Sequence, residues 1–130
     1  MHKVLQPKDW KPAKGYANGI EATGRQIFVA GQVGWTGDQV FESDDFVAQT
    51  EQALRNIAAV LAESGATPEH VVRMTWYVTD RGEYVRRAKE LGAVYREIVG
   101  SHYPAMTAVE VSALIEERAR VEIEVTAVIA

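Results

Sequence analysis

The chain has 130 residues, 47% of them hydrophobic, which is enough for one buried core and too little for two ordinary domains. Its 14 lysines and arginines are outnumbered by 18 acidic residues, and both signs are scattered along the sequence. A nucleic-acid partner needs a concentrated basic face, so we expect none. Without cysteine there are no disulfides or thiolate metal sites, and we expect a reducing compartment, by default the cytoplasm. We also expect no signal peptide, no membrane span and a single domain over residues 1–130.

The first third of the sequence predicts an arm, a hairpin and a loop. Residues 1–14 carry two prolines and four lysines without any period, which is typical of an irregular arm. Tyr16–Ile20 and Gln26–Ala30 suit strands, and the turn around Gly24 predicts a hairpin between them. Three glycines within residues 31–37 then indicate a loop or a bulged strand end.

Two amphipathic helices with a strand between them are predicted in the middle of the chain. Ser43 and the two aspartates after it suit a helix N-terminus, an apolar face follows as far as Leu61, and Gly65 ends the helix. Alternation over Val72–Thr79 predicts a strand. A second helix is expected over residues 83–99, where apolar residues again share one face.

Residues 105–113 and 118–129 alternate with a period of two, and their short connection favours an antiparallel pair. The order strand, strand, helix, strand, helix, strand, strand predicts an α+β fold: one mixed, mainly antiparallel sheet with both helices on a single face. The uncovered face of the last strand would carry Arg118, Arg120, Glu122, Glu124 and Thr126. Trp76 or Tyr77 would add an aromatic ring to this face, so we expect self-association.

Metal and phosphate chemistry have little support. The three histidines, His2, His70 and His102, lack the spacing of a metal site, so we expect structural or solvent roles for them and no metal. The glycines of residues 31–37 match no phosphate-binding loop, and the serines have no base visible in the sequence for acyl transfer.

Glu122 and Glu124 lie two residues apart, on one strand face, where burial could make either an acid or a base catalyst. A solvated face, or salt bridges to Arg118 and Arg120, is the ordinary outcome for such charges. Tyr16 offers a phenolic donor and residues 101–104 could line a cleft, although each alone is more typical of packing.

Four segments resemble the RidA (YjgF) family in their order and spacing. They are residues 15–20 (GYANGI), 27–32 (IFVAGQ), 103–111 (YPAMTAVEV) and 121–124 (VEIE). The resemblance covers about residues 15–130, and the motifs are specific in combination rather than singly.

This resemblance implies a fold like that of bacterial chorismate mutase, in which three subunits join their sheets into a barrel-like core with three clefts between neighbours. Archetypal members hydrolyse reactive enamines and imines, such as 2-aminoacrylate, to a 2-keto acid and ammonia without metal or cofactor. An arginine holds the substrate carboxylate and a glutamate positions the attacking water.

By position, the resemblance assigns the glutamate to Glu122 and the cleft tyrosine to Tyr16, and it brings backbone groups near Gly31 to the ligand. Two polar groups of the archetype are replaced, the arginine by Met106 and a serine by Ala30. Losing a bidentate carboxylate pair costs about 1.5–3 kcal/mol of binding, so we do not expect archetypal 2-aminoacrylate deamination.

Three further residues are expected to bind substrate. Arg120 is a candidate replacement cation, but it stands about 7 Å from Glu122 along the strand, so a changed substrate is the better interpretation. Trp35, in the glycine-rich segment, and His102, before the fifth strand, complete the predicted cleft.

The leading hypothesis is a divergent RidA-like hydrolase or deaminase acting on a small imine, enamine or related carbonyl metabolite. Glu122 would orient water, Tyr16 would bind or donate, and Met106 would shape an apolar cleft. The alternative is a non-catalytic trimer that binds a small molecule or another protein. A third hypothesis is that the chain is an endoribonuclease or a translation inhibitor, and it rests only on descriptions of some relatives. The excess of acidic over basic residues opposes it.

Overall fold

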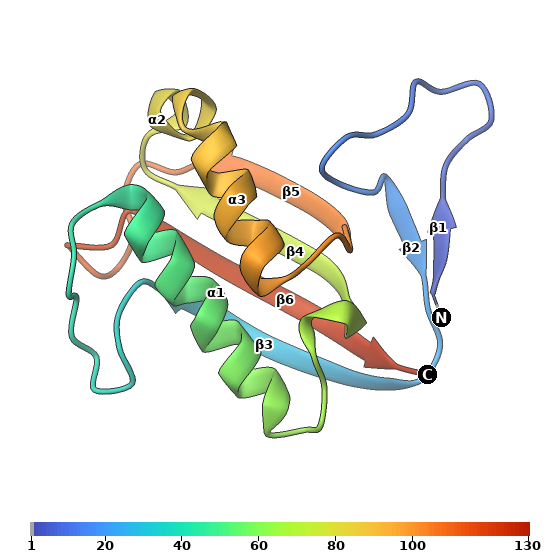
Figure 1. The fold of residues 1–130 in the computed structure, drawn as a ribbon, viewed down its shortest axis with the longest axis horizontal. Helices are drawn as coiled ribbons and strands as arrows, with labels where there is room; N and C mark the ends of the chain where they lie inside the picture. Colours follow the sequence, from blue (N-terminus) through green and yellow to red (C-terminus); the bar gives the residue numbers. More distant parts are fainter. Residues whose placement is uncertain (1) are drawn as a thin grey trace.

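The computed structural model describes residues 2–130, and its elements form two sheets and one layer of helices (Figure 1). In chain order they are β1 (Lys3–Leu5), β2 (Gly19–Glu21), β3 (Arg25–Val33), α1 (Phe46–Ala62), the 3₁₀ turn η1 (Pro68–His70), β4 (Val71–Val78), α2 (Arg81–Arg86), α3 (Ala88–Ile98), β5 (Ala105–Glu110) and β6 (Val121–Ile129). The main sheet has the strand order β3-β6-β4-β5, and Figure 1 shows α1 and α3 side by side across one of its faces. The predicted α+β fold is confirmed.

Helix α1 begins where the sequence predicts, because Asp45 caps it. The Asp45 side chain accepts a hydrogen bond from the amide of Ala48 at 3.0 Å. The helix ends before Gly65, whose φ of 73° is a left-handed conformation that glycine adopts without strain. Between these ends, the predicted apolar face is buried against the sheet.

Strand β6 runs through the middle of the main sheet. Val121, Ile123, Val125 and Ala127 are all buried on the helix-covered side, as the alternation predicted. Their neighbours in the sequence are mostly half-buried on the opposite side, which we call the open face because no helix covers it.

The predicted hairpin between residues 16 and 30 is wrong. Strand β2 pairs with β1, so residues 3–5 form a strand where an irregular arm was expected. Strand β3 instead starts opposite Ile129 at the end of β6. Gly24 makes this possible: its φ is 146°, and a Cβ there would clash with the carbonyl oxygen of Ile129.

The predicted pairing of the last two strands is also wrong. Strand β5 runs parallel to β4, with Arg73 opposite Ala105 and Val78 opposite Glu110. Helices α2 and α3 form the crossover that a parallel pair requires. Because β3 and β4 occupy both edges of β6, no edge of β6 remains for β5.

The second predicted helix is two helices, separated at Arg87, whose φ of −101° and ψ of 18° are not helical. Asp80 caps α2 by accepting from the amide of Glu83 at 3.0 Å. Tyr84 and Leu91 lie on either side of the break and line the same cleft, so the apolar pattern continues across it. Helical spacing alone therefore could not reveal the break.

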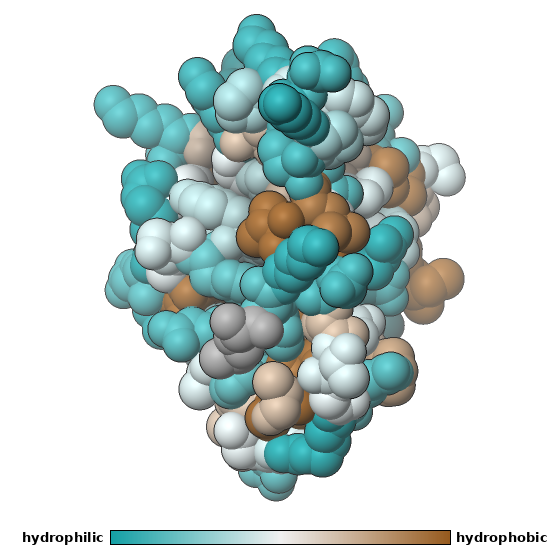
Figure 2. Space-filling view, turned by 90° about the vertical axis from the view of Figure 1, so that its right-hand side faces the viewer, coloured by the Kyte–Doolittle hydropathy of each residue, from teal (hydrophilic) through white to brown (hydrophobic). Residues whose placement is uncertain are grey.

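Figure 2 shows the side of the molecule where β1 and β2 lie as a mainly hydrophilic surface interrupted by separate hydrophobic patches. Exposed hydrophobic residues of the N-terminal segment are Val4, Leu5 and Trp10. Within residues 2–130, none of the helices combines the length and the apolar character needed to span a bilayer.

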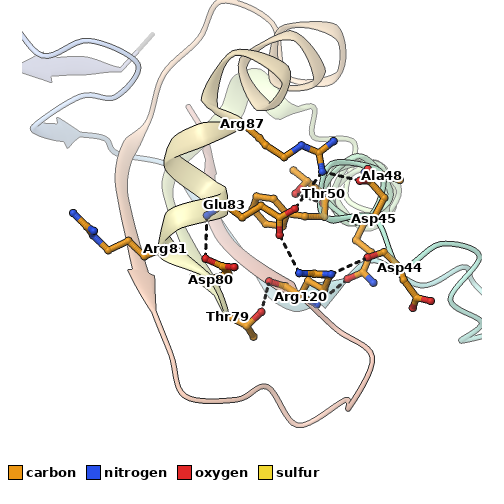
Figure 3. A network of polar contacts seen from close by, with 12 residues as sticks. Asp44, Asp45, Ala48, Thr50, Thr79, Asp80, Arg81, Glu83, Arg87 and Arg120 are labelled. Atoms are coloured by element: carbon orange, nitrogen blue, oxygen red, sulfur yellow. Dashed lines mark hydrogen bonds and ion pairs between the residues drawn. The ribbon is translucent and has the colours of Figure 1, made fainter.

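Arg87 joins the two short helices to the start of α1 (Figure 3). Its guanidinium lies 2.7 Å from a carboxylate oxygen of Asp45, 3.3 Å from Glu83 and 2.9 Å from Glu90. Glu83 in turn binds Arg120 at 3.0 Å, next to the start of β6. The network therefore connects α1, α2, α3 and the central strand.

These contacts predict a pH-dependent contribution to stability. Hydrogen bonds from Arg87 lower the pKa of Asp45 and of Glu90. A carboxyl with a lowered folded-state pKa stabilises the fold above the ordinary carboxyl pKa of about 4, and this contribution is lost as the pH falls through the lowered value. We expect Arg87→Gln to lower the urea midpoint at about pH 7 and to have little effect at about pH 2. Equal losses at both pH values would contradict this account.

Candidate functional site

Strand β5, helix α3 and the segment before β2 enclose a cleft of about 420 Å³ on the helix-covered side of the sheet. We call it the aromatic cleft, because its walls include the side chains of Tyr16, Trp76, Tyr84, Tyr95, Tyr103 and Met106. Two of the residues expected from the sequence, Tyr16 and Met106, therefore lie together.

The segment that carries Tyr16 is fixed to the edge of the sheet. The amide of Ala17 donates to the carbonyl of Pro104 at 3.0 Å, and Ala17 forms an isolated parallel bridge with Ala105. The Tyr16 side chain itself remains 43% exposed at the cleft. It can therefore present its hydroxyl to a ligand.

Tyr95 forms a rigid wall of the aromatic cleft. Its ring stacks on Tyr103 with centroids 5.3 Å apart and planes 4° from parallel. Its hydroxyl donates to the carbonyl of His102 at 2.6 Å, and burial raises its pKa well above the ordinary tyrosine value. Tyr95 is therefore a structural donor rather than a proton-transfer group.

A second group of predicted residues lies on the open face, where β3 has a bulge. The register between β3 and β6 shifts between Val29 and Gln32. Strand β3 therefore has one residue more than β6 in the stretch that contains Ala30 and Gly31, which is a β-bulge. A Cβ on Gly31 would clash with the Oε2 atom of Glu122 and would lie 2.8 Å from its Cδ. The predicted bulged strand end is confirmed, and its glycine makes room for the Glu122 carboxylate.

The two glutamates on this face have different surroundings. The hydroxyl of Tyr77 donates to Glu124 at 2.5 Å, which raises the pKa of Tyr77. Glu122 is half-buried and, among residues 2–130, makes no hydrogen bond or ion pair with another side chain. Its carboxylate therefore remains available to a ligand or a water molecule.

Arg118 and Arg120 point away from these glutamates. The Arg120 guanidinium binds Glu83 at 3.0 Å and the carbonyl of Asp44 at 3.4 Å (Figure 3), and Arg118 binds the Asp44 carboxylate at 2.9 Å. The expectation that both arginines share the face of Glu122 is wrong, because strand β6 begins only at residue 121. Arg120 is thus not placed to replace the arginine missing at Met106.

Trp35 and His102 lie outside the aromatic cleft. Trp35 packs against Phe41 at 5.7 Å, and its carbonyl accepts from the side chain of Asn56 at 2.7 Å. His102 places its Nε2 atom 2.7 Å from the carbonyl oxygen of Val71. Among the residues that the structure describes, histidine, aspartate and glutamate side chains form no group of three that fits a metal ion.

One chain does not bring the two groups of predicted residues together. Trp76 lines the aromatic cleft, whereas the next residue, Tyr77, binds Glu124 on the open face. Tyr16 and Met106 therefore lie on the helix-covered side, and Glu122 belongs to the opposite face of the same sheet.

Comparison with known proteins shows to which family the chain belongs. A family model described as Endoribonuclease L-PSP matches residues 7–129. A RutC family protein from Aquifex aeolicus is 32% identical over 130 residues, which cover 98% of this chain and 99% of the relative. The chain belongs to the RidA (YjgF) family.

Solved structures of RidA-family proteins share the fold. A Rid family protein of Yersinia pestis, YyfB, is 31% identical, with a TM-score of 0.84 and 98% of both chains covered. A member of the YjgF/YER057c/UK114 family from Mycobacterium tuberculosis is 38% identical, with a TM-score of 0.66 and 88% and 87% of the two chains covered. The fold that the sequence resemblance implied for a single chain is thereby confirmed.

Several residues near the two groups of candidate residues were not identified from the sequence. A hollow of about 440 Å³ on the open face is lined by Arg73 and Thr75 as well as Ala30 and Glu124. The alternation of β4 placed Arg73 and Thr75 on one face but did not indicate a hollow. Lys14 and Arg96, at the aromatic cleft, belong to no motif and gave no signal.

Proposed function

We propose that this RidA-family protein is a cytoplasmic hydrolase that converts a small imine, enamine or related compound into a carbonyl product and ammonia. The observation that supports it most directly is the half-buried Glu122 carboxylate, which lies over Gly31 at the bulge and has no bonding partner among residues 2–130. A carboxylate held in this way can orient a water molecule and accept its proton.

The proposed reaction needs no group beyond those of the chain and water. Glu122 accepts a proton as the water oxygen bonds to the imine carbon. The proton then passes to the nitrogen to give a carbinolamine. The hydroxyl proton of the carbinolamine moves to the nitrogen, through Glu122 or water, as the carbon–nitrogen bond breaks, and the products are a carbonyl compound and ammonia. An enamine enters this sequence after a proton has moved from its nitrogen to its carbon, which gives the imine. Tyr16 donates a hydrogen bond to the substrate, and Met106 gives the cleft an apolar wall.

We further propose that the site forms between subunits of a homotrimer, because one chain holds its two halves on opposite faces of the sheet. The open face carries Phe28, which is 71% exposed, and an exposed aromatic ring of this kind favours contact with another subunit. A neighbouring copy could then bring its aromatic cleft to Glu122. Light scattering should give three times the chain mass, and a monomer would contradict the shared site.

The test of this function is release of ammonia and keto acid from a panel of enzymatically generated imines. The panel should extend from 2-aminoacrylate to imines with larger apolar groups and should include neutral compounds. The native protein should hydrolyse at least one larger imine in preference to 2-aminoacrylate. No ammonia from any imine would contradict the hydrolase proposal.

Met106→Arg tests what the missing arginine changes. A restored carboxylate pair of about 1.5–3 kcal/mol corresponds to a gain of about tenfold or more in kcat/KM for 2-aminoacrylate. Met106→Leu, which keeps the wall apolar, is the matched control and should not produce this gain. An unchanged kcat/KM in the arginine variant would show that position 106 does not contact the carboxylate.

A non-catalytic binding role is the second candidate, and the replacement of the family arginine by Met106 favours it. Ligand binding that persists in Glu122→Gln, without turnover in the native protein, would support that role. Endoribonuclease activity, named in the description of the family model, has weaker support, because acidic residues outnumber basic ones by 18 to 14.

Gly31→Ala is expected to lower turnover while leaving the fold intact. The added Cβ would collide with Glu122 from its Oε2 atom back to its Cγ atom, so the whole carboxylate arm would have to leave its position. We expect kcat/KM to fall by about tenfold or more, with the urea midpoint nearly unchanged.

Gly37→Ala is the control for this substitution, because a Cβ at Gly37 would meet no atom within 4 Å. It should change neither turnover nor stability. If both variants hydrolyse imines at the native rate, the position of the Glu122 carboxylate does not matter to the reaction.

A further inference from the structure

The aromatic cleft is larger than a three-carbon substrate requires. Its volume of about 420 Å³ lies within the range of about 300–1,000 Å³ that is typical of sites for larger ligands. The side chains of Tyr16, Trp76, Tyr84 and Tyr103 supply aromatic surface around it. A ligand that fills this space needs an aromatic or similarly bulky apolar group.

The charged side chains of the cleft are both cationic. Lys14 and Arg96 line it, no carboxylate does, and neither cation forms a salt bridge within residues 2–130. Both residues are exposed, so they lie where the cleft meets solvent. An anionic group of a ligand would be attracted to this position.

The interior of the cleft provides aromatic packing. Trp76 is only 3% exposed and meets Tyr84 edge-on, with ring centroids 6.0 Å apart. Its Nε1 atom is buried and has no hydrogen-bond acceptor in the described part of the chain.

From these observations we infer that the cleft binds an amphipathic anion: an imine or enamine acid with an aromatic or bulky apolar side chain. The side chain packs among the rings, and the carboxylate lies near Lys14 and Arg96. The reaction of this substrate rests on the proposed function, whereas its binding does not.

Isothermal titration calorimetry of the intact protein with three stable compounds tests the binding. They are 2-oxo-4-phenylbutanoate, pyruvate, which lacks the phenyl group, and 4-phenylbutan-2-one, in which a methyl group replaces the carboxylate. The phenyl keto acid should bind about tenfold more tightly than either of the others. Pyruvate or the ketone binding as tightly as the phenyl keto acid would overturn the inference.

A pair of charge variants locates the carboxylate. The double variant Lys14→Gln/Arg96→Gln should bind the phenyl keto acid about fivefold more weakly than the native protein and should bind the ketone equally well. The control double variant Lys8→Gln/Arg81→Gln removes the same amount of charge outside the cleft. It should weaken the binding of neither compound. Equal weakening by both pairs would overturn the assigned position. Tight binding of the phenyl keto acid without turnover of any imine would overturn the hydrolase proposal alone.

Discussion

Glu122→Gln is expected to lower kcat/KM for imine hydrolysis by about a hundredfold to ten-thousandfold. Glutamine keeps the size and one acceptor oxygen of the side chain but cannot take a proton from water. Because Glu122 forms no ion pair in the described chain, the free energy of unfolding should change by less than about 0.5 kcal/mol. Steady-state kinetics and urea denaturation of the same preparation measure both quantities.

Glu124→Gln is the matched control, on the same strand and the same face. Glu124 already accepts a hydrogen bond from Tyr77, and an amide oxygen can still accept it. The turnover of this variant should therefore stay within a few-fold of the native value. Comparable losses in the two variants would assign the effect to the charge of the face rather than to Glu122.

Gln49→Leu is expected to cause the largest loss of stability, about 2–4 kcal/mol. The Gln49 side chain is 1% exposed, and its Nε2 atom donates to the carbonyls of Ser43 and Arg118, each at 3.0 Å. Its Oε1 atom accepts from the amide of Arg120 at 2.8 Å. Leucine fills similar space but leaves these three backbone groups without their partner.

Gln52→Leu provides the control on the same helix. The Gln52 side chain bonds only to Asn56 one turn later, at 2.8 Å, so its replacement should cost less than about 0.5 kcal/mol. Urea denaturation measures both variants. A loss of less than about 1 kcal/mol for Gln49→Leu would show that water satisfies the exposed backbone groups.

Local patterns in the sequence predicted the helices and strands well, and their pairing poorly. The apolar alternation of β6 and the helical face of α1 depend on neighbouring residues, so they are visible in a short window. Pairing depends on distant segments: β2 meets β1, and β5 meets β4, because β6 already has two partners. The use of Gly24 for a close approach to Ile129 is likewise invisible in the sequence.

The candidate site was predicted only in part, because some of its residues belong to local patterns and others depend on distant segments. The family motifs singled out Glu122 and Tyr16 as candidates, and the glycines of residues 31–37 indicated the bulge at Gly31, because each depends on a short segment. Arg120 was misplaced, since strand alternation was extended beyond the start of β6. Gln49 gave no signal, because a buried glutamine on a helix is recognised only through the distant backbone that it binds.

Recovery of activity by mixing two inactive variants tests most directly whether the site is shared between subunits. Glu122→Gln removes the proposed base, and Met106→Trp fills the aromatic cleft. Each variant should be inactive when refolded alone. Refolded together in equal amounts, they should regain about one quarter of the native activity, because random assembly leaves about one in four interfaces with both halves intact. No recovery in mixed oligomers verified by mass spectrometry would contradict a site shared between subunits.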